Sequence, residues 1–401
     1  MAARTLRLDR AAVRAHRPPE DHVDYKLISA DDHLDLQYLP RDLWTTRLPR
    51  TLRDRAPRVE DRDAGSVWLC DGGFWGRWAG GRRATGPKSA FNAFDRGGVD
   101  ETELRPANAT LRLADMDRDG VEAQVMYGPV SSMSVEDPAL RTACLQAYND
   151  WLIEFCSSAP RRLLGAAILP PEDPTAARDE VYRLAKKGGL RQANLQIARA
   201  TPRISDPAWE PLWTAFEETG LILSFHVVVF GVGGSLMGPM AVDQDKTASV
   251  FNTTKLFMSQ FLDPFVDLFG WGILERHPKL RLVMAESGVG WLPWIVQELD
   301  YRFWRLYEAR EYWDQRGGID LFMKPSELFR RQVWVSFQED HVAMSLLKFY
   351  GEGHLLWASD YPHPDSTWPN SRQVIEKQMG DLSPEVRKQL TRDNAAALYG
   401  L

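Results

Sequence analysis

Cysteine is scarce in this chain of 401 residues. The three cysteines, Cys70, Cys144 and Cys156, are widely spaced and form no C-x-x-C pair. A disulfide framework or a cysteine-based zinc site is therefore not expected, and a reducing cytoplasm is the expected location.

An excess of positive charge is also missing, since 49 basic residues face 55 acidic ones and the net charge is −6. This balance gives no reason to expect nucleic acid or an anionic membrane as a partner. Arginine and aspartate interrupt residues 1–17, so no signal peptide is expected. The uncharged stretch 221–242 is long enough to span a bilayer, but it contains His226, Pro239 and several glycines. We expect a strand and a glycine-rich loop there, with no membrane span.

Repeats of short period are absent too. Apolar strands instead alternate with helices along the chain. The expected strands are residues 26–30, 121–128, 165–169, 193–197, 221–226, 280–286, 333–337 and 354–360. Helices are expected between them, including 138–157, 174–187 and 207–219. Eight such units predict an α/β fold, a closed (β/α)8 TIM barrel completed by two C-terminal helices.

Two segments fall outside this pattern. Residues 1–25, rich in Arg, Asp and Pro, are expected to form an arm on the surface or on a neighbouring subunit, which suggests a homodimer. The barrel then occupies residues 26–401, with a long aromatic-rich insertion at about 49–109 after the first strand. Its tryptophans argue against disorder. We expect it to cover a site, with Trp75 and Trp78 binding substrate as an apolar wall.

Metal-ligand residue types follow the expected strands. They are Asp31 and His33 after the first strand, then His226, Glu286 and Asp360 after the fifth, sixth and eighth. Two residues apart on extended backbone, Asp31 and His33 share one face. The carboxyl ends of barrel strands meet at one mouth. Three carboxylates there would repel one another, and a divalent cation is the simplest compensation.

Taken singly, each of these residues has an ordinary structural explanation. His226 could be a hydrogen-bonded loop residue, and Glu286 or Asp360 could cap a turn or helix. His277, at a helix end before Pro278, is expected to be such a cap. The combination of five residues at one mouth favours the metal site.

Four motifs then carry a family resemblance. They are Ser29–His33 (SADDH), Glu275–Leu280 (ERHPKL), Ala285–Gly288 (AESG) and Trp357–His363 (WASDYPH). The chain resembles the amidohydrolase-related branch of the amidohydrolase superfamily, metal-dependent barrel enzymes that include hydrolases and non-oxidative decarboxylases. The resemblance extends from Ile28 to the terminal Asn394–Gly400. It implies that Asp31, His33, His226 and Asp360 hold the catalytic metal, with Asp360 also near an activated water.

The chain departs from the superfamily pattern at three places. Asp31 replaces the first histidine of the usual His-x-His motif, and Glu286 stands where the sixth strand often ends in histidine. The fourth strand carries Asn194 and Gln196 and no lysine, so a carbamylated bridging lysine is not expected there.

The ligand set also bears on the number and kind of metal ions. A single zinc ion prefers about four ligands, whereas two dications could share two imidazoles and three carboxylates. Oxygen-rich mixed sites favour Mn, Fe or Mg. We expect one or two ions of Fe, Mn or Zn, and hypothesise that Glu286 or Asp360 contacts a second ion.

Three functions follow from these expectations. The first is hydrolysis or C–C cleavage (decarboxylation) of a small organic substrate by a metal-activated water or hydroxide, with Asp360, His226 and His363 as catalytic residues. Tyr361 and His363 are expected to orient the substrate or the proton shuttle, although the Pro-His-Pro turn has a purely structural alternative. The second, which the resemblance permits, is a non-haem di-iron monooxygenase hydroxylating a bulky terpenoid-like substrate with O2. The third is a catalytically silent binding protein, against which the intact ligand set argues.

Overall fold

The structure is a computed structural model that describes residues 25–63, 65–79, 92–99, 104–129, 135–228, 247–318 and 320–401. The expected N-terminal arm, apart from Tyr25, and the expected glycine-rich loop after the fifth strand lie outside these residues. Within them, no helix combines the length and the apolar character needed to cross a membrane.

Eight strands form one sheet in which sequence neighbours pair in parallel. They are β1 (Leu27–His33), β5 (Val121–Tyr127), β6 (Leu163–Ile168), β7 (Gln192–Asn194), β8 (Ile222–His226), β9 (Leu282–Ala285), β10 (Val333–Phe337) and β11 (Leu355–Trp357). The predicted (β/α)8 barrel is confirmed. The fourth strand is shorter than predicted, because a 3₁₀ turn begins at Ile197.

Backbone hydrogen bonds just beyond β11 bring the first and last strands together. The Asp360 amide donates to the Asp31 carbonyl at 2.9 Å, and the His33 amide donates to the Tyr361 carbonyl at 2.7 Å. These bonds hold the segment after β11 against the end of β1. Asp360 and Asp31 are therefore neighbours in space, although they are far apart in sequence.

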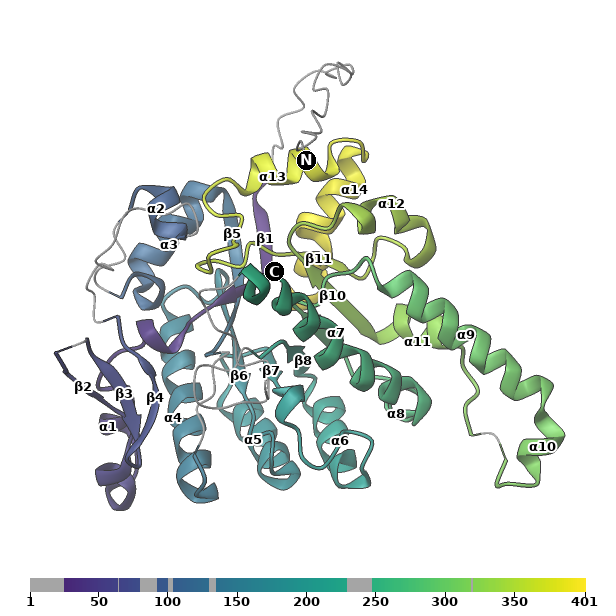
Figure 1. Cartoon of the computed structure of the whole chain (residues 1–401), viewed down its shortest axis with the longest axis horizontal. Helices are drawn as coiled ribbons and strands as arrows, with labels where there is room; N and C mark the ends of the chain where they lie inside the picture. The colour runs from purple at the N-terminus through teal and green to yellow at the C-terminus, as the bar shows by residue number, and fades with distance from the viewer. Residues whose placement is uncertain are drawn as a thin grey trace, which may run out of the picture.

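Helices surround the strands (Figure 1). The main ones are α3 (Ala109–Asp119), α4 (Pro138–Ser157), α5 (Pro174–Lys187), α6 (Glu210–Thr219), α7 (Thr247–Gly270), α9 (Leu292–Glu308), α11 (Pro325–Gln332) and α12 (His341–Tyr350). The bounds of α4 and α5 agree with the prediction. Each of these two helices begins with proline after an aspartate whose side chain accepts backbone N–H bonds, a favourable helix start.

The C-terminal region contains more helices than predicted. Instead of two, there are α13 (Ser371–Met379), α14 (Pro384–Lys388) and α15 (Asn394–Tyr399) in the described chain. A π-helical turn at Gln389–Asp393 joins the last two.

Side chains alternate between two cores along each strand. On β8, Ile222 belongs to the apolar cluster inside the barrel, whereas Leu223 and Phe225 belong to the cluster between strands and helices. His226 follows the inward positions of this alternation. The alternation thus directs the imidazole at the end of β8 into the barrel.

The insertion has more regular structure than its sequence pattern predicted. Its strands β2 (Arg58–Glu60), β3 (Val67–Cys70) and β4 (Gly73–Arg77) form an antiparallel side sheet. This side sheet lies beside α1 (Leu43–Arg47), apart from the barrel strands (Figure 1). Asp71 and Gly72, both at positive φ, turn β3 into β4. An Asp-Gly pair between two short runs is a hairpin signal that the sequence analysis did not use.

Candidate metal centre

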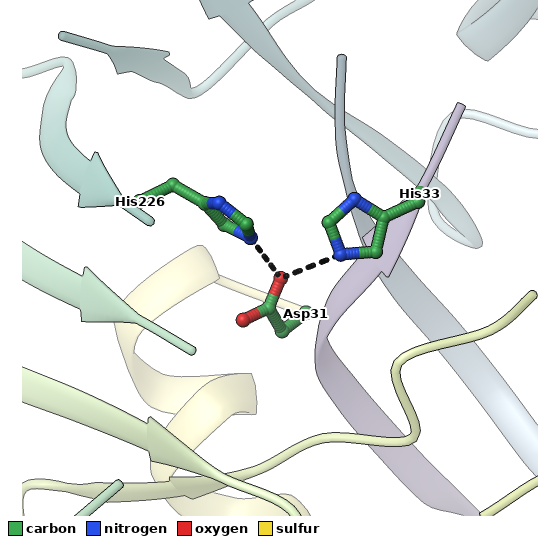
Figure 2. Close-up of side chains that lie close together, drawn as sticks. All are labelled: Asp31, His33 and His226. Atoms are coloured by element: carbon green, nitrogen blue, oxygen red, sulfur yellow. Dashed lines mark ion pairs between the residues drawn. The ribbon is translucent and has the colours of Figure 1, made fainter. Parts of the chain in front are cut away.

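Three predicted ligands converge where β1 and β8 end. Figure 2 shows Asp31 between the rings of His33 and His226. Asp31 Oδ1 lies 3.2 Å from His226 Nε2 and 3.7 Å from His33 Nε2, and Asp360 Oδ1 lies 2.9 Å from His33 Nε2. All four side chains are at most 2% exposed. The structure thus places the predicted ligands that follow or end β1, β8 and β11 at one rim.

The atoms that face this point lack ordinary partners. Asp31 Oδ1, His33 Nε2, His226 Nε2 and both Asp360 carboxylate oxygens are buried and form no hydrogen bond of good geometry. The short contacts that they make are ion pairs with one another and with His363. Burying such atoms is costly unless a partner satisfies them. Asp31, His33 and His226 offer ligand atoms within 4.8 Å of one another, and a mixed nitrogen and oxygen set of this kind fits a divalent cation.

Neighbouring groups hold these side chains in position. His226 Nδ1 lies 2.6 Å from the Val227 carbonyl, which leaves Nε2 to face the cluster. Ser336 Oγ donates to Asp31 Oδ2 at 3.1 Å and accepts from the Glu286 amide at 2.8 Å. Ser336 was not among the residues predicted from the sequence. Its signal was a lone polar residue within the apolar strand Val333–Phe337.

Glu286 stands at the edge of the cluster. Its Oε2 lies 3.4 Å from His226 Nε2, and its side chain is more exposed than those of the other ligands. Both Glu286 and Asp360 adopt left-handed backbone, with φ of 53° and 60°. Such conformations are unfavourable for residues other than glycine and concentrate at functional sites. Glu286 as a metal ligand stays a prediction.

His363 joins the centre from the loop after β11. Its ring stacks on His33 with centroids 3.7 Å apart, and its Nδ1 lies 2.9 Å from Asp360 Oδ1. Its Nε2 lies 3.3 Å from Asp35 Oδ2. His33, Asp360 and His363 form a second group with metal-ligand spacing. From the sequence, Asp35 is a candidate partner that orients His33; in the structure its carboxylate pairs with His363.

The charges of this centre shift its titrations strongly. Burial lowers the pKa of His363, but the Asp360 and Asp35 carboxylates raise it more, so it lies well above its usual value. Burial raises the pKa of Asp360, but His363 and His33 bring it below its usual range. The pKa of His226 is raised to about 9, because Asp31 and Glu286 outweigh its burial. In the metal-free protein, His363 therefore holds a proton between two carboxylates.

Tyr361, predicted to contact substrate, is used in packing. Its side chain is buried, and its hydroxyl donates to Asp115 Oδ2 at 2.7 Å. The Arg112 guanidinium lies 5.2 Å from the ring centroid. Because its hydroxyl is hydrogen-bonded to Asp115 and one ring face contacts Arg112, Tyr361, which follows Asp360 in the sequence, fixes the position of this segment. Its predicted contact with substrate is not favoured by these interactions.

The two tryptophans predicted to line the substrate pocket lie in the side sheet. Trp75 is buried, and its ring packs 5.5 Å from that of Trp44. Trp78 Nε1 donates to the Leu39 carbonyl at 2.9 Å. These contacts hold the insertion to the segment that joins it to β1. The role of both rings as a substrate wall stays a prediction that the contacts do not favour.

Comparison with known proteins begins with a family model. Residues 66–401 match the model described as Amidohydrolase. The matched segment contains His226, Glu286, Asp360 and His363, whereas β1, with Asp31 and His33, precedes it.

Curated relatives are decarboxylases. The chain is 24% identical over 304 residues to a gamma-resorcylate decarboxylase of Rhizobium sp. (strain MTP-10005), covering 72% of this chain and 86% of the relative. It is 22% identical over 300 residues to a 2-amino-3-carboxymuconate-6-semialdehyde decarboxylase of Dictyostelium discoideum, covering 73% and 76%. Neither relative is described as an oxygenase, so the di-iron alternative gains no support from them.

Solved structures share the fold. An amidohydrolase of Mycobacterium avium subsp. paratuberculosis superposes with a TM-score of 0.72 at 22% identity, covering 94% of this chain and 100% of the other. A 5-carboxyvanillate decarboxylase of Novosphingobium aromaticivorans, complexed with manganese, gives 0.63 at 19% identity, covering 94% and 97%. These likenesses support the barrel, and the family model covers most of the sequence. The chain belongs to the amidohydrolase family.

Proposed function

We propose that this protein is a metal-dependent decarboxylase of a small hydroxylated carboxylic acid. The observation that carries the proposal is the buried cluster of Asp31, His33, His226 and Asp360, within which two groups that share His33 have metal-ligand spacing. The gamma-resorcylate and 5-carboxyvanillate decarboxylases among the similar proteins support this reaction class. Manganese, present in a solved relative, is a suitable ion for the mixed ligand set.

Decarboxylation requires a proton at one particular atom. The bond between the carboxylate carbon and its neighbour breaks, CO2 leaves, and the electron pair left on the neighbouring carbon takes up a proton. The His363–Asp360 pair is placed to supply this proton: His363 carries it, and Asp360 Oδ1, 2.9 Å from His363 Nδ1, can relay it to the substrate carbon. His363, hydrogen-bonded also to Asp35, can return a proton to Asp360.

A divalent ion held by Asp31, His33, His226 and Asp360 would supply Lewis-acid chemistry to the bound acid. The protein supplies a dry environment around it. The Tyr127 ring packs against His226 with centroids 4.6 Å apart, and both side chains are buried. Excluding water strengthens the interactions of charged groups inside the site. It also favours loss of CO2 over attack by water, so hydrolysis is the second candidate reaction of this centre.

We also infer a homodimer located in the cytoplasm. Trp294, Tyr301 and Trp304 of α9 are at least half exposed, and exposed aromatic side chains are typical of protein interfaces. Free buried thiols at Cys70, Cys144 and Cys156 suit a reducing compartment. Light scattering should give twice the monomer mass, and Trp304→Glu should reduce it to that of the monomer.

The function is tested by release of CO2. Manganese-loaded protein should release CO2 from 2,6-dihydroxybenzoate or 5-carboxyvanillate, and Asp360→Asn should lower the rate by roughly 10²–10⁴-fold. Ester or amide hydrolysis without CO2 release would assign the centre to hydrolysis. Oxygen uptake by protein containing two irons would favour the monooxygenase alternative.

A further inference from the structure

Asn194 is the last residue of the fourth barrel strand. It pairs in register with Ile168 of β6 and Ser224 of β8. His226 lies two residues beyond Ser224 on β8, at the same end of the barrel. Asn194 is therefore level with Ser224, two residues before His226, the predicted metal ligand on the adjacent strand.

The direction of the Asn194 side chain follows from its neighbour on the strand. Gln192 Nε2 donates to the Tyr127 hydroxyl at 2.7 Å, and Gln192 Oε1 accepts from the Tyr399 hydroxyl at 2.6 Å. Both tyrosines belong to the apolar cluster inside the barrel. Because side chains two apart on a strand share a face, Asn194 also points into the barrel, nearer the mouth. The Tyr127 ring, which packs on His226, links this layer to the metal centre.

The Asn194 amide is unusual in being buried without a partner for its oxygen. The residue is 5% exposed, and Oδ1 makes no hydrogen bond. Asn149 of α4 shows the ordinary arrangement. Its Nδ2 donates to the Ile168 carbonyl and to Glu180, and its Oδ1 accepts from the Ile168 amide at 2.8 Å. An unpartnered buried amide oxygen costs stability, so its presence beside a ligand site points to a donor on the ligand.

We propose that Asn194 Oδ1 accepts a hydrogen bond from a hydroxyl group of the substrate and thereby selects hydroxylated acids. The inference rests on the proposed decarboxylase function, which makes a hydroxylated carboxylic acid the substrate class. A buried acceptor discriminates strongly against an analogue that lacks the hydroxyl, because that analogue leaves the acceptor unpaired. Asn194 is then a specificity residue, distinct from the groups that bind the metal or move the proton.

The test compares Asn194→Ala with Asn149→Ala as the matched control. Calorimetry on the manganese-loaded protein gives Kd values for 2,6-dihydroxybenzoate, 2-hydroxybenzoate and benzoate, and CO2 release gives kcat and KM for the first. The wild type should prefer the dihydroxy acid over the weakest analogue by at least about tenfold. Asn194→Ala should lose most of this preference and raise KM more than it lowers kcat, with metal content and melting temperature unchanged. Asn149→Ala should keep the preference and melt at lower temperature.

Other outcomes contradict the proposal. It is overturned if Asn194→Ala keeps the wild-type preference, if it weakens all three acids equally, or if the wild type shows no preference. Asn194→Ser, which retains an acceptor oxygen, should fall between wild type and alanine. Failure of the proposed function gives a different result: the wild type binds hydroxylated acids through Asn194 but releases no CO2.

Discussion

Two histidines of this molecule, His226 and His277, each lie close to two carboxylates. His226 Nε2 is 3.2 Å from Asp31 and 3.4 Å from Glu286. His277 has Glu217 at 2.9 Å from Nδ1 and Glu210 at 2.9 Å from Nε2. At His277 each ring nitrogen has its own carboxylate. At His226 one nitrogen faces both carboxylates, while the other is turned to a backbone carbonyl.

The difference separates an ion-pair network from a ligand set. Glu210 is also paired with Arg276, and Glu217 accepts from the Lys279 amide, so the His277 group is satisfied without an added ion. It lies just before β9, at the amino end of the strand, where barrel residues generally contribute to stability. His277 is the C-cap of α8 (Ile273–Arg276), as expected from the sequence, and its ring also pairs with the two glutamates. Residue types alone therefore do not identify a metal site; convergence of unpaired atoms does.

The largest difference is expected when the imidazole of His226 and that of His277 are removed in separate variants. In His226→Ala, bound metal should fall to background and decarboxylation should be lost, because a ligand and its fixed geometry disappear. His277→Gln should keep wild-type metal content and kcat. Elemental analysis of both purified variants checks this. Equal metal loss in the two variants would contradict the assignment of metal binding to His226 and of ion pairing to His277.

Metal affinity should depend on pH through the group around His226 and not through the group around His277. Metal competes with the proton that Asp31 and Glu286 stabilise on His226, whose pKa is raised to about 9. Below that pH, binding releases a proton, so affinity should rise about tenfold per pH unit between pH 6 and 8 and level near 9. Titration of apoprotein with Mn2+ at several pH values measures this. His277→Gln should give the same curve, and a flat wild-type curve would refute the assignment.

Ser336 offers a smaller test on the metal side of the comparison. In Ser336→Ala, Asp31 Oδ2 loses its hydrogen bond and the Glu286 amide loses its acceptor. Manganese affinity should fall about 10–100-fold, the usual effect of losing a group that orients a ligand. Unchanged affinity would mean that backbone geometry alone orients Asp31.

The smallest effect is expected on the free energy of unfolding, from changes in the group around His277. His277→Gln should cost about 1 kcal/mol, since Glu210 is partly exposed. The pKa of Glu210 is lowered by Arg276 and His277 against an opposing effect of burial. A lowered folded-state pKa contributes stability above the unfolded pKa, and this contribution is lost as pH falls through the folded value. Melting temperatures of wild type and Glu210→Gln should therefore converge below about pH 4.

The barrel could be predicted from its alternating strands and helices, and the candidate metal centre from polar residues at the ends of apolar runs typical of strands. Asp31, His226 and Asp360 can be recognised from the sequence because they are ionisable residues at such ends. Neutral residues, and residues whose partner is distant in the sequence, cannot be recognised in this way. Ser336 interrupts a strand without a charge, and Asp35 finds its partner His363 only when β1 and β11 close the barrel.

The side sheet escaped prediction for a different reason. Its strands are only three to five residues long, and they are stabilised by packing of Trp68 and Trp75 on Trp44. Such contacts between segments leave no periodic pattern in the sequence. Asn194 shows the same limit at the site: its amide was visible in the sequence, but its unpaired oxygen depends on the surrounding fold.

Anomalous diffraction from crystals of the manganese-loaded protein would show directly whether a metal ion binds between β1, β8 and β11. We expect a manganese peak about 2.0–2.3 Å from both His33 Nε2 and His226 Nε2, with carboxylate oxygens of Asp31 and Asp360 as the remaining ligands. A peak beside His277, or one that contacts His226 without His33, would contradict it.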